Sequence, residues 1–156
     1  MLEPQSRTLL LDSLAAPPEH QLDWAVGTTY SLDLIALLAA PVAFAFSNCH
    51  DRVGKPIAEP LALLKATRQY ADRILLFCQA GRIHVPRAYQ PLLMHLEESI
   101  AEALAPRGGA FHPKAWFLRY VGPDQSVIYR LLCLSRNMTF DRSWDTMLVL
   151  DGAIKS

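Results

Sequence analysis

The sequence predicts an α/β sandwich with a mixed β-sheet and a β-hairpin near the C-terminus. Through residues 22–105, apolar runs of strand type alternate with segments of helical periodicity, which is the pattern of an α/β domain. Further on, two strand-like runs are joined by Gly122-Pro123-Asp124-Gln125, a strong turn signal. Hydrophobic residues make up 51% of the 156 residues and charged residues 19%, so we expect one domain with a substantial core.

The chain is expected to begin with an N-terminal arm, residues 1–21, and to continue as one domain over residues 22–156. Within the arm, the leucines of Leu9–Leu14 suggest a short helix, which Pro17-Pro18 ends. The domain then opens with a predicted strand over Leu22–Tyr30, where β-branched and aromatic residues surround a central glycine.

A buried helix is expected next, over residues 34–46. Ser31 is a good N-cap, and Asp33 falls in the first turn, where a negative charge favours the helix dipole. The segment is apolar nearly all round, so the helix should be buried on most of its sides. It is too short to span a bilayer, which takes about 20 apolar residues.

The middle of the chain is predicted to hold two amphipathic helices, Pro56–Arg73 and Pro91–Ala105. In both segments apolar residues recur at helical spacing, and charged residues fall on the other side. Between them, Ile74–Cys78 is a short strand-type run that Gly81 ends.

The last part of the chain is predicted to be mostly strand. Phe111–Val121 and Val127–Leu134 form the hairpin, and Thr146–Leu150 adds a final strand. Trp116 shares a face with His112 if the first strand is regular. It either packs in the core, which is the favoured interpretation, or lines a cleft.

Composition restricts the partners of this protein. Lysines plus arginines number 15 and acids number 15, so no net charge draws the chain to nucleic acid or to an anionic membrane, and any contact with phosphate must be local. Cys49, Cys78 and Cys133 lie in or beside apolar runs without any CxxC spacing, which indicates reduced core thiols in a cytoplasmic protein. The sequence shows no metal-ligand cluster, export signal or lipid-docking helix, so we expect no cofactor, no metal and no membrane association.

Polar residues at a spacing of two flank the predicted hairpin turn. Side chains alternate faces along a strand, so His112 and Lys114 point the same way, about 7 Å apart. Ser135 and Asn137 share one face of the partner strand. Symmetric pairing about the turn at 122–125 predicts that His112 lies opposite Ser135, with Asn137 as a diagonal neighbour. An imidazole nucleophile beside three donors is what attack on a phosphodiester requires.

The order of these residues resembles that of the phospholipase D superfamily of phosphodiesterases. The resemblance covers residues 22–152, and its motifs lie within Phe111–Gly152. They are a His-x-Lys element, a Ser-x-Asn-x-Thr element after the hairpin, and a later acid: His112, Lys114, Ser135, Asn137, Thr139 and Asp145. The resemblance implies a phospholipase D-like α/β/α sandwich that carries one half of a two-motif site.

The resemblance also implies a role for each of these residues. His112 would be the nucleophile that forms a phosphohistidine, and Lys114 and Asn137 would hold the non-bridging phosphate oxygens. Ser135 would support the histidine or the phosphate. Asp145 would bond the second ring nitrogen of His112 and fix its tautomer; a plain surface acid is the alternative interpretation.

The sequence departs from the superfamily pattern at two positions. Arg119 stands where the superfamily usually has an aspartate, and Leu134 stands in place of a glycine. Arg136 and Arg142 are candidates for further phosphate contacts, with ordinary surface arginines as the alternative. The segment 28–30 (Thr-Thr-Tyr) either reaches the rim of the site or forms a structural turn.

A complete site in this superfamily uses two facing motifs, and this sequence carries one. The chain is therefore expected to act as a homodimer or together with a missing second half. The predicted function is metal-independent phosphodiester hydrolysis, with nucleic acid as the substrate. Two alternatives are a non-catalytic dimerisation or nucleic-acid-binding module, and a phosphodiesterase that acts on lipids or small molecules.

Overall fold

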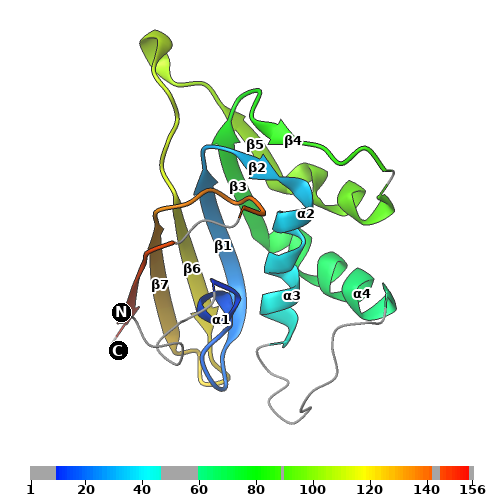
Figure 1. Cartoon of the computed structure of the whole chain (residues 1–156). Coiled ribbons are helices and arrows are strands. Elements are labelled where there is room, and N and C mark those ends of the chain that lie inside the picture. The colour runs from blue at the N-terminus through cyan, green and yellow to red at the C-terminus, as the bar shows by residue number, and fades with distance from the viewer. Residues whose placement is uncertain (1–9, 47–59, 89, 142–144, 155–156) are drawn as a thin grey trace, which may run out of the picture.

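A six-stranded mixed sheet organises the structure, a computed structural model that describes residues 10–46, 60–88, 90–141 and 145–154 (Figure 1). Its strands are β1 (Gln21–Thr29), β3 (Ile74–Gln79), β5 (Ile100–Ala103), β6 (Ala115–Val121), β7 (Val127–Leu134) and β8 (Met147–Ala153), in the order β5-β3-β1-β6-β7-β8. β5, β3 and β1 are parallel to one another, whereas β6, β7 and β8 continue from β1 as antiparallel neighbours. The predicted α/β class, mixed sheet and C-terminal hairpin are confirmed.

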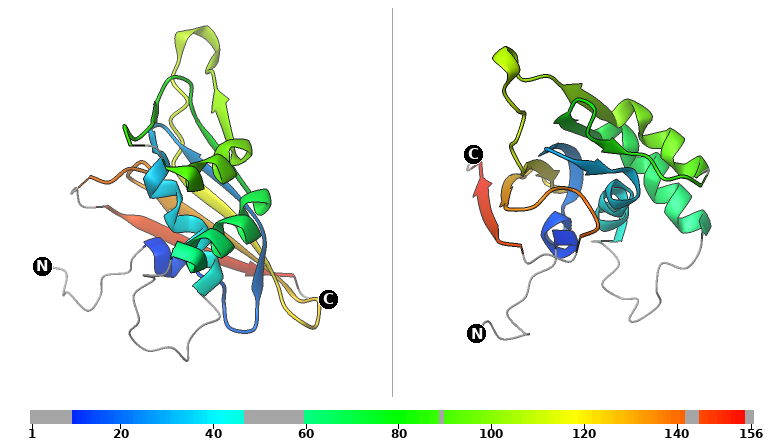
Figure 2. Two further views of the ribbon diagram at one scale, coloured as in Figure 1. Left: turned by 90° about the vertical axis from the view of Figure 1, so that its right-hand side faces the viewer. Right: turned by 45° about the horizontal axis from the view of Figure 1, so that its top comes forward.

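The α-helices lie together on one side of the sheet, as the two views of Figure 2 show. They are α1 (Leu10–Leu14), α2 (Leu34–Leu37), α3 (Ala39–Phe46) and α4 (Pro60–Tyr70). Three 3₁₀ segments accompany them: η2 (Ala71–Arg73), η3 (Pro91–Ser99) and η4 (Pro106–Gly108). Two short parallel strands, β2 (Leu32–Asp33) and β4 (Ile83–His84), pair with each other beside the sheet. None of the described helices is long and apolar enough to cross a membrane.

The core lies between this helical layer and the facing side of the sheet. Its largest fully buried side chains come from both layers: Trp116, Tyr120, Phe44, Leu14, Leu22, Leu32, Leu37, Leu76, Leu96, Leu118 and Leu132. Trp116 is thus a core residue, as the favoured interpretation predicted. Strand residues alternate between the two faces, and the side of the sheet that faces away from the helices, here called the outer face, carries large apolar side chains: Trp24, Leu75, Phe117, Tyr129, Leu148 and Leu150. Of the two helical layers of the expected α/β/α sandwich, the described residues supply one.

The N-terminal segment is more closely integrated into the domain than an arm. Leu14 is buried in the core, and the Tyr120 hydroxyl donates a hydrogen bond of 2.9 Å to the Leu14 carbonyl. At the next helix, Asp33 rather than Ser31 is the N-cap, because its carboxylate accepts the Ile35 amide hydrogen at 2.9 Å. The predicted helix over 34–46 is present as α2 and α3.

The segment 91–105, predicted as one helix, is a 3₁₀ segment followed by a strand. The helical part ends at Ser99, and β5 pairs with β3 from Ile100 onward, with Ile100 opposite Leu76. The edge of β3 offers unpaired backbone groups, and pairing with them satisfies more of the backbone than one further helical turn would. The helix predicted over 56–73 is observed as α4 and η2, and residues 56–59 lie outside the described residues.

The hairpin of β6 and β7 is one residue out of the predicted register, since Ala115 pairs with Cys133. The Gln125 amide donates to the Gly122 carbonyl at 3.1 Å, and Gln125 adopts a left-handed φ of 65°. Ser126 therefore becomes a fifth loop residue, and the Gly122 amide donates to its carbonyl at 2.9 Å. A left-handed glutamine leaves no signal in the sequence, so the slip was not predictable.

β6 also begins later than predicted, at Ala115 rather than at Phe111. Pro113 has no amide hydrogen to donate to a neighbouring strand, so the ladder cannot continue through it. His112 and Lys114 consequently lie on the segment before β6, and the predicted pairing of His112 with Ser135 is wrong.

The cysteines do not all behave as core thiols. Cys78 is buried on β3, where burial is the main cause that raises the pKa of its thiol. Cys133 is exposed on the outer face of β7, because that face is not covered by any described helix. Cys49 lies outside the described residues.

Candidate functional site

The predicted site residues lie at one edge of the sheet, where β1, β3 and β7 end and β6 begins. The antiparallel pairing of β6 with both β1 and β7 brings these strand ends together. Two segments carry the candidate side chains at this edge: residues 109–114, which lead into β6, and residues 135–139, which follow β7 (Figure 1).

Polar side chains at the ends of β1 and β3 hold the first segment in place. Thr28 Oγ1 accepts the Ala115 amide hydrogen at 3.0 Å, and Gln79 Oε1 accepts the Phe111 amide hydrogen at 2.6 Å. The backbone is therefore held at Phe111 and at Ala115, on either side of His112. Pro113 further restricts the backbone of His112 to extended conformations.

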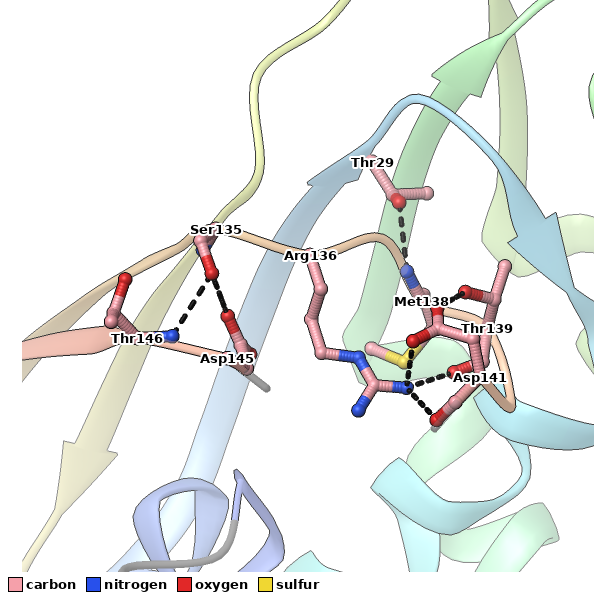
Figure 3. Close-up of polar contacts among 8 residues, drawn as sticks. All are labelled: Thr29, Ser135, Arg136, Met138, Thr139, Asp141, Asp145 and Thr146. Atoms are coloured by element: carbon pink, nitrogen blue, oxygen red, sulfur yellow. Dashed lines mark hydrogen bonds and ion pairs between the residues drawn. The ribbon is translucent and has the colours of Figure 1, made fainter. Parts of the chain in front are cut away.

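Thr29, the last residue of β1, holds the second segment (Figure 3). Its hydroxyl is buried, accepts the Met138 amide hydrogen at 3.0 Å and donates to the Ser31 carbonyl at 2.9 Å. The Asp33 amide donates to the Met138 carbonyl at 2.8 Å, so both backbone groups of Met138 are bound to the turn after β1. The 28–30 segment is thus the end of β1 and not a turn, and its residues contact both segments of the site.

His112 and Lys114 are in direct contact. The Lys114 ammonium lies 3.0 Å from Nδ1 and 3.1 Å from Nε2 of the His112 ring, and 3.4 Å from the His112 carbonyl oxygen. Because the ammonium is nearly equidistant from the two ring nitrogens, it lies over the imidazole ring and not along the lone pair of one nitrogen. An imidazole acts as a nucleophile through an unprotonated ring nitrogen.

An aromatic and cationic stack adjoins His112. The Tyr30 ring lies 4.9 Å from the His112 ring, tilted by 48°, and the Arg82 guanidinium lies 5.4 Å from the centre of the Tyr30 ring. His112 is exposed, whereas Tyr30 is half-buried and gives the imidazole a firm surface on one side. The stack places Arg82 on the Tyr30 ring, which in turn lies against His112.

Asn137 is hydrogen-bonded to Tyr30, the residue whose ring lies against His112. Its Oδ1 accepts the Tyr30 amide hydrogen at 3.3 Å, which orients the side-chain amide. Within the described part of the chain, the Asn137 NH₂ group has no protein acceptor, so its two hydrogens can be donated to a bound anion.

Ser135 and Asp145 form a pair of their own (Figure 3). The Ser135 hydroxyl and amide both donate to the Asp145 carboxylate, the amide at 3.1 Å, and Ser135 Oγ accepts the Thr146 amide hydrogen at 2.9 Å. This arrangement joins the end of β7 to the start of β8. The hydrogen bond predicted between Asp145 and His112 is not formed, because the carboxylate is engaged by Ser135.

Arg136 turns back onto its own loop (Figure 3). Its guanidinium donates to the Thr139 carbonyl at 2.6 Å and to the Asp141 carbonyl at 3.2 Å, and it lies 3.5 Å from the Asp141 carboxylate. These contacts shape the 136–141 loop. Arg142, the other arginine candidate, lies outside the described residues.

Cationic and acidic side chains both lie at this edge, and the carboxylates of Asp33, Glu102 and Asp145 each accept a backbone or hydroxyl hydrogen. Lys114 contacts His112, and Arg82 lies over the neighbouring Tyr30 ring. Among the described residues, no carboxylate contacts His112, and no cluster of three His, Cys, Asp or Glu side chains could hold a metal ion. An ammonium group beside an imidazole is suited to binding an anion.

The sequence did not single out Gln79 or Arg82 as part of this edge. Gln79 ends β3, and Arg82 follows it by three positions, so both come from the carboxyl end of a strand that is parallel to β1. Ligands of α/β sheets commonly bind at the carboxyl ends of strands. Polar residues just after Ile74–Cys78 were therefore the signal that could have identified them.

Comparisons with known proteins find few matches. No protein-family model matches the chain, and no curated protein sequence matches it. Two solved structures that resemble it are variants of yeast tyrosyl-DNA phosphodiesterase, at 12% and 13% sequence identity and a TM-score of 0.43 in both cases. Each alignment covers 83% of this chain, which spans 23% or 24% of the length of the yeast protein.

Proposed function

We propose that this chain supplies one half of a metal-independent phosphodiesterase site of the phospholipase D type, with nucleic acid as its substrate. The observation that carries the proposal is the contact of the Lys114 ammonium with the His112 ring. The Asn137 amide, oriented by the residue that stacks on His112, adds two further donors. A nucleophile with a cation and an amide beside it suits attack on a phosphodiester.

In the proposed reaction, the unprotonated nitrogen of His112 attacks phosphorus, and a P–N bond forms as the P–O bond to the leaving group breaks. The leaving oxygen takes a proton from a histidine of a second copy or of a missing second half. That histidine then removes a proton from water, which attacks the phosphohistidine and releases a phosphomonoester. Lys114 and Asn137 stabilise the charge on the non-bridging oxygens throughout.

Nucleic acid is the favoured substrate because of the Arg82–Tyr30 pair next to His112. Bases of single-stranded nucleic acid stack on aromatic rings and on guanidinium planes, and arginine also binds phosphate. A lipid substrate would instead call for an apolar surface around the histidine.

The test is a cleavage assay on labelled single- and double-stranded DNA and RNA in excess EDTA. We expect turnover to persist without metal, because the proposed site uses none. His112→Ala should lose at least about 1,000-fold in kcat, as expected for a nucleophile, and Lys114→Ala about 100-fold. His95→Ala, on η3 and away from this edge, is the matched control. Cleavage by His112→Ala at the wild-type rate, with normal melting, would rule out the assignment.

A non-catalytic nucleic-acid-binding module is the second candidate. Asp145 is bonded to Ser135 instead of His112, and Arg119, at the position of the usual aspartate, is paired with Asp23. In that case the wild-type protein should bind labelled single-stranded DNA in a salt-dependent manner without cleaving it. Lys114→Ala should then weaken binding, and no phosphohistidine should be detected by mass spectrometry.

A further inference from the structure

The outer face of the sheet is apolar and exposed. Its large side chains remain between about one third and one half accessible: Trp24 40%, Leu75 37%, Phe117 48%, Tyr129 42%, Leu148 54% and Leu150 51%. Soluble monomers rarely expose contiguous apolar patches of more than a few hundred Å², and larger patches usually mark an interface.

Strand pairing makes this patch continuous. One cross-strand row crosses five strands from β3 to β8: Leu75, Val26, Phe117, Leu131 and Leu150. The row on one side of it contains Phe77, Thr28, Ala115, Cys133 and Leu148. The row on its other side contains Trp24, Arg119, Tyr129 and Gly152. The three rows form one surface without a polar break in its centre.

The charge on this surface indicates which kind of partner could bind it. Arg119 is the charged residue of the three rows; it forms an ion pair with Asp23, and hydrogen bonds with Tyr129 and Asp23 raise the pKa of its guanidinium. A nucleic acid or an anionic membrane would need unpaired cations around the aromatic side chains. A symmetric contact places the same face of two copies against each other, and a mostly apolar face whose arginine is ion-paired meets little like-charge repulsion there.

The size of the outer face also suits such a contact. Six strands, about 4.8 Å apart and about seven residues long at 3.3 Å each, span a footprint of roughly 650 Å². Two such faces would bury on the order of 1,300 Å², within the range of stable specific interfaces.

We propose that the outer face binds the outer face of a second copy of this chain, in a symmetric homodimer with the two sheets packed face to face. Sheets packed in this way lie about 10 Å apart, with their inward side chains interdigitated. The surface does not include His112 or Lys114, so this inference is independent of the proposed reaction.

The first test is the molar mass in solution of the whole chain and two variants, measured by light scattering and sedimentation over a range of concentrations. Phe117→Glu places a charge in the middle row, and Val85→Glu, at a residue 63% exposed after β4, is the matched control. We expect the wild type and Val85→Glu to be dimers and Phe117→Glu to be a monomer with the same circular dichroism spectrum. A wild type that stays monomeric at every concentration, or a Phe117→Glu variant that still dimerises, would overturn the proposal.

A second test needs no change on the outer face. In a Cys49→Ser protein, a thiol reagent should report on exposed Cys133, because Cys78 is buried. Dimerisation would cover Cys133, so labelling should slow by at least about tenfold as the concentration rises through the dissociation constant. A labelling rate that does not depend on concentration would contradict the dimer. Binding of single-stranded oligonucleotides by the monomer through Phe117 would also contradict the dimer. It would identify nucleic acid as the partner of the outer face.

Discussion

Gly27 lies where β1 passes between two large core side chains. A Cβ atom at this position would lie 2.4 Å from Leu76 Cδ1 and 3.1 Å from two atoms of the Trp116 ring, and both neighbours are fully buried. Gly27→Ala should therefore lower the free energy of unfolding by about 1–3 kcal/mol through overpacking. Urea denaturation provides the measurement.

Because Gly152 lies on the outer face, both glycine substitutions are compared in the monomeric Phe117→Glu background. There Gly152→Ala is the matched control, since nothing lies within 4 Å of the Cβ that it would add. It should change the free energy of unfolding by less than about 1 kcal/mol, in the stabilising direction, since alanine restricts the unfolded chain. Equal effects of the two substitutions would mean that the space around Gly27 is not limiting.

Thr29 offers a second prediction for a single residue. Thr29→Val keeps the shape of the buried side chain but leaves the Met138 amide and the Ser31 carbonyl without their partner. We expect a loss of about 1–3 kcal/mol in the free energy of unfolding and faster hydrogen exchange at the Met138 amide. Thr146→Val should have neither effect, because the bonds of Thr146 to Ser135 use its backbone. Unchanged exchange at Met138 in Thr29→Val would show that the hydroxyl does not hold the loop.

The proximity of His112 and Lys114 is the part of the site that the sequence could predict, because they are two positions apart, although the strand expected to align them begins only at Ala115. The partner of Asp145 was not predictable in this way. From the sequence, several donors could have bonded to this carboxylate. The pairing of β7 with β8 places Asp145 next to Ser135, which is why Ser135 is its partner. Hydrogen bonds between loops depend on tertiary geometry, which residue order alone does not contain.

Arg130 joins three elements, since its guanidinium donates to the Ser13 and Ala15 carbonyls beside α1 and forms a two-point ion pair with Asp151 of β8. The hydrogen bond from Arg130 lowers the pKa of the Asp151 carboxyl below its ordinary value near 3.8. A lowered pKa in the folded state stabilises the protein above the ordinary value, and this contribution is lost as the pH falls through the lowered one.

We therefore expect Asp151→Asn to be less stable than the wild type at neutral pH, and the difference to shrink below about pH 4. Thermal melts of the two proteins across this range provide the measurement. Asp72→Asn is the control, because Asp72 is exposed and has no ion pair with any described residue. A difference between wild type and Asp151→Asn that stays constant down to pH 2 would contradict the coupling.

The strands were the elements that the sequence predicted best, and β7 matches its predicted bounds at both ends. The long apolar runs that form strands depend on local composition. The prediction of one helix over 91–105 was wrong because Ile100–Ala103 pairs with the free edge of β3. That pairing depends on tertiary structure and not on local composition. Helical periodicity in a short segment does not exclude pairing with a distant edge.

The molecule as a whole has a sheet that is apolar on both faces and helices on one of them. Strands that are apolar on both sides indicate burial on both sides, and the sandwich with two helical layers was expected from the resemblance to the phospholipase D superfamily. The pattern of apolar residues along the strands does not show which face of the sheet the helices of this chain cover. Phe117 and Trp116 are adjacent aromatic residues of one strand, yet one is 48% exposed and the other 1%.

A face-to-face dimer predicts that stability depends on protein concentration. The thermal midpoint of the wild type should rise as the concentration increases, because dimerisation removes folded monomer by mass action. The midpoint of Phe117→Glu should not change over the same range. A wild-type midpoint that is constant over a hundredfold range of concentration would be inconsistent with the interface.

The central place of β1 has a consequence for synthesis on the ribosome. β1 pairs on one side with β6, and Thr28 is 87 positions before its partner Ala115. At about 5–20 residues per second, a nascent β1 waits roughly 4–17 s for this partner. During that interval one edge of an apolar strand is unpaired, which is a condition for aggregation. Chaperone dependence during translation should therefore be greatest before residue 121 leaves the ribosome.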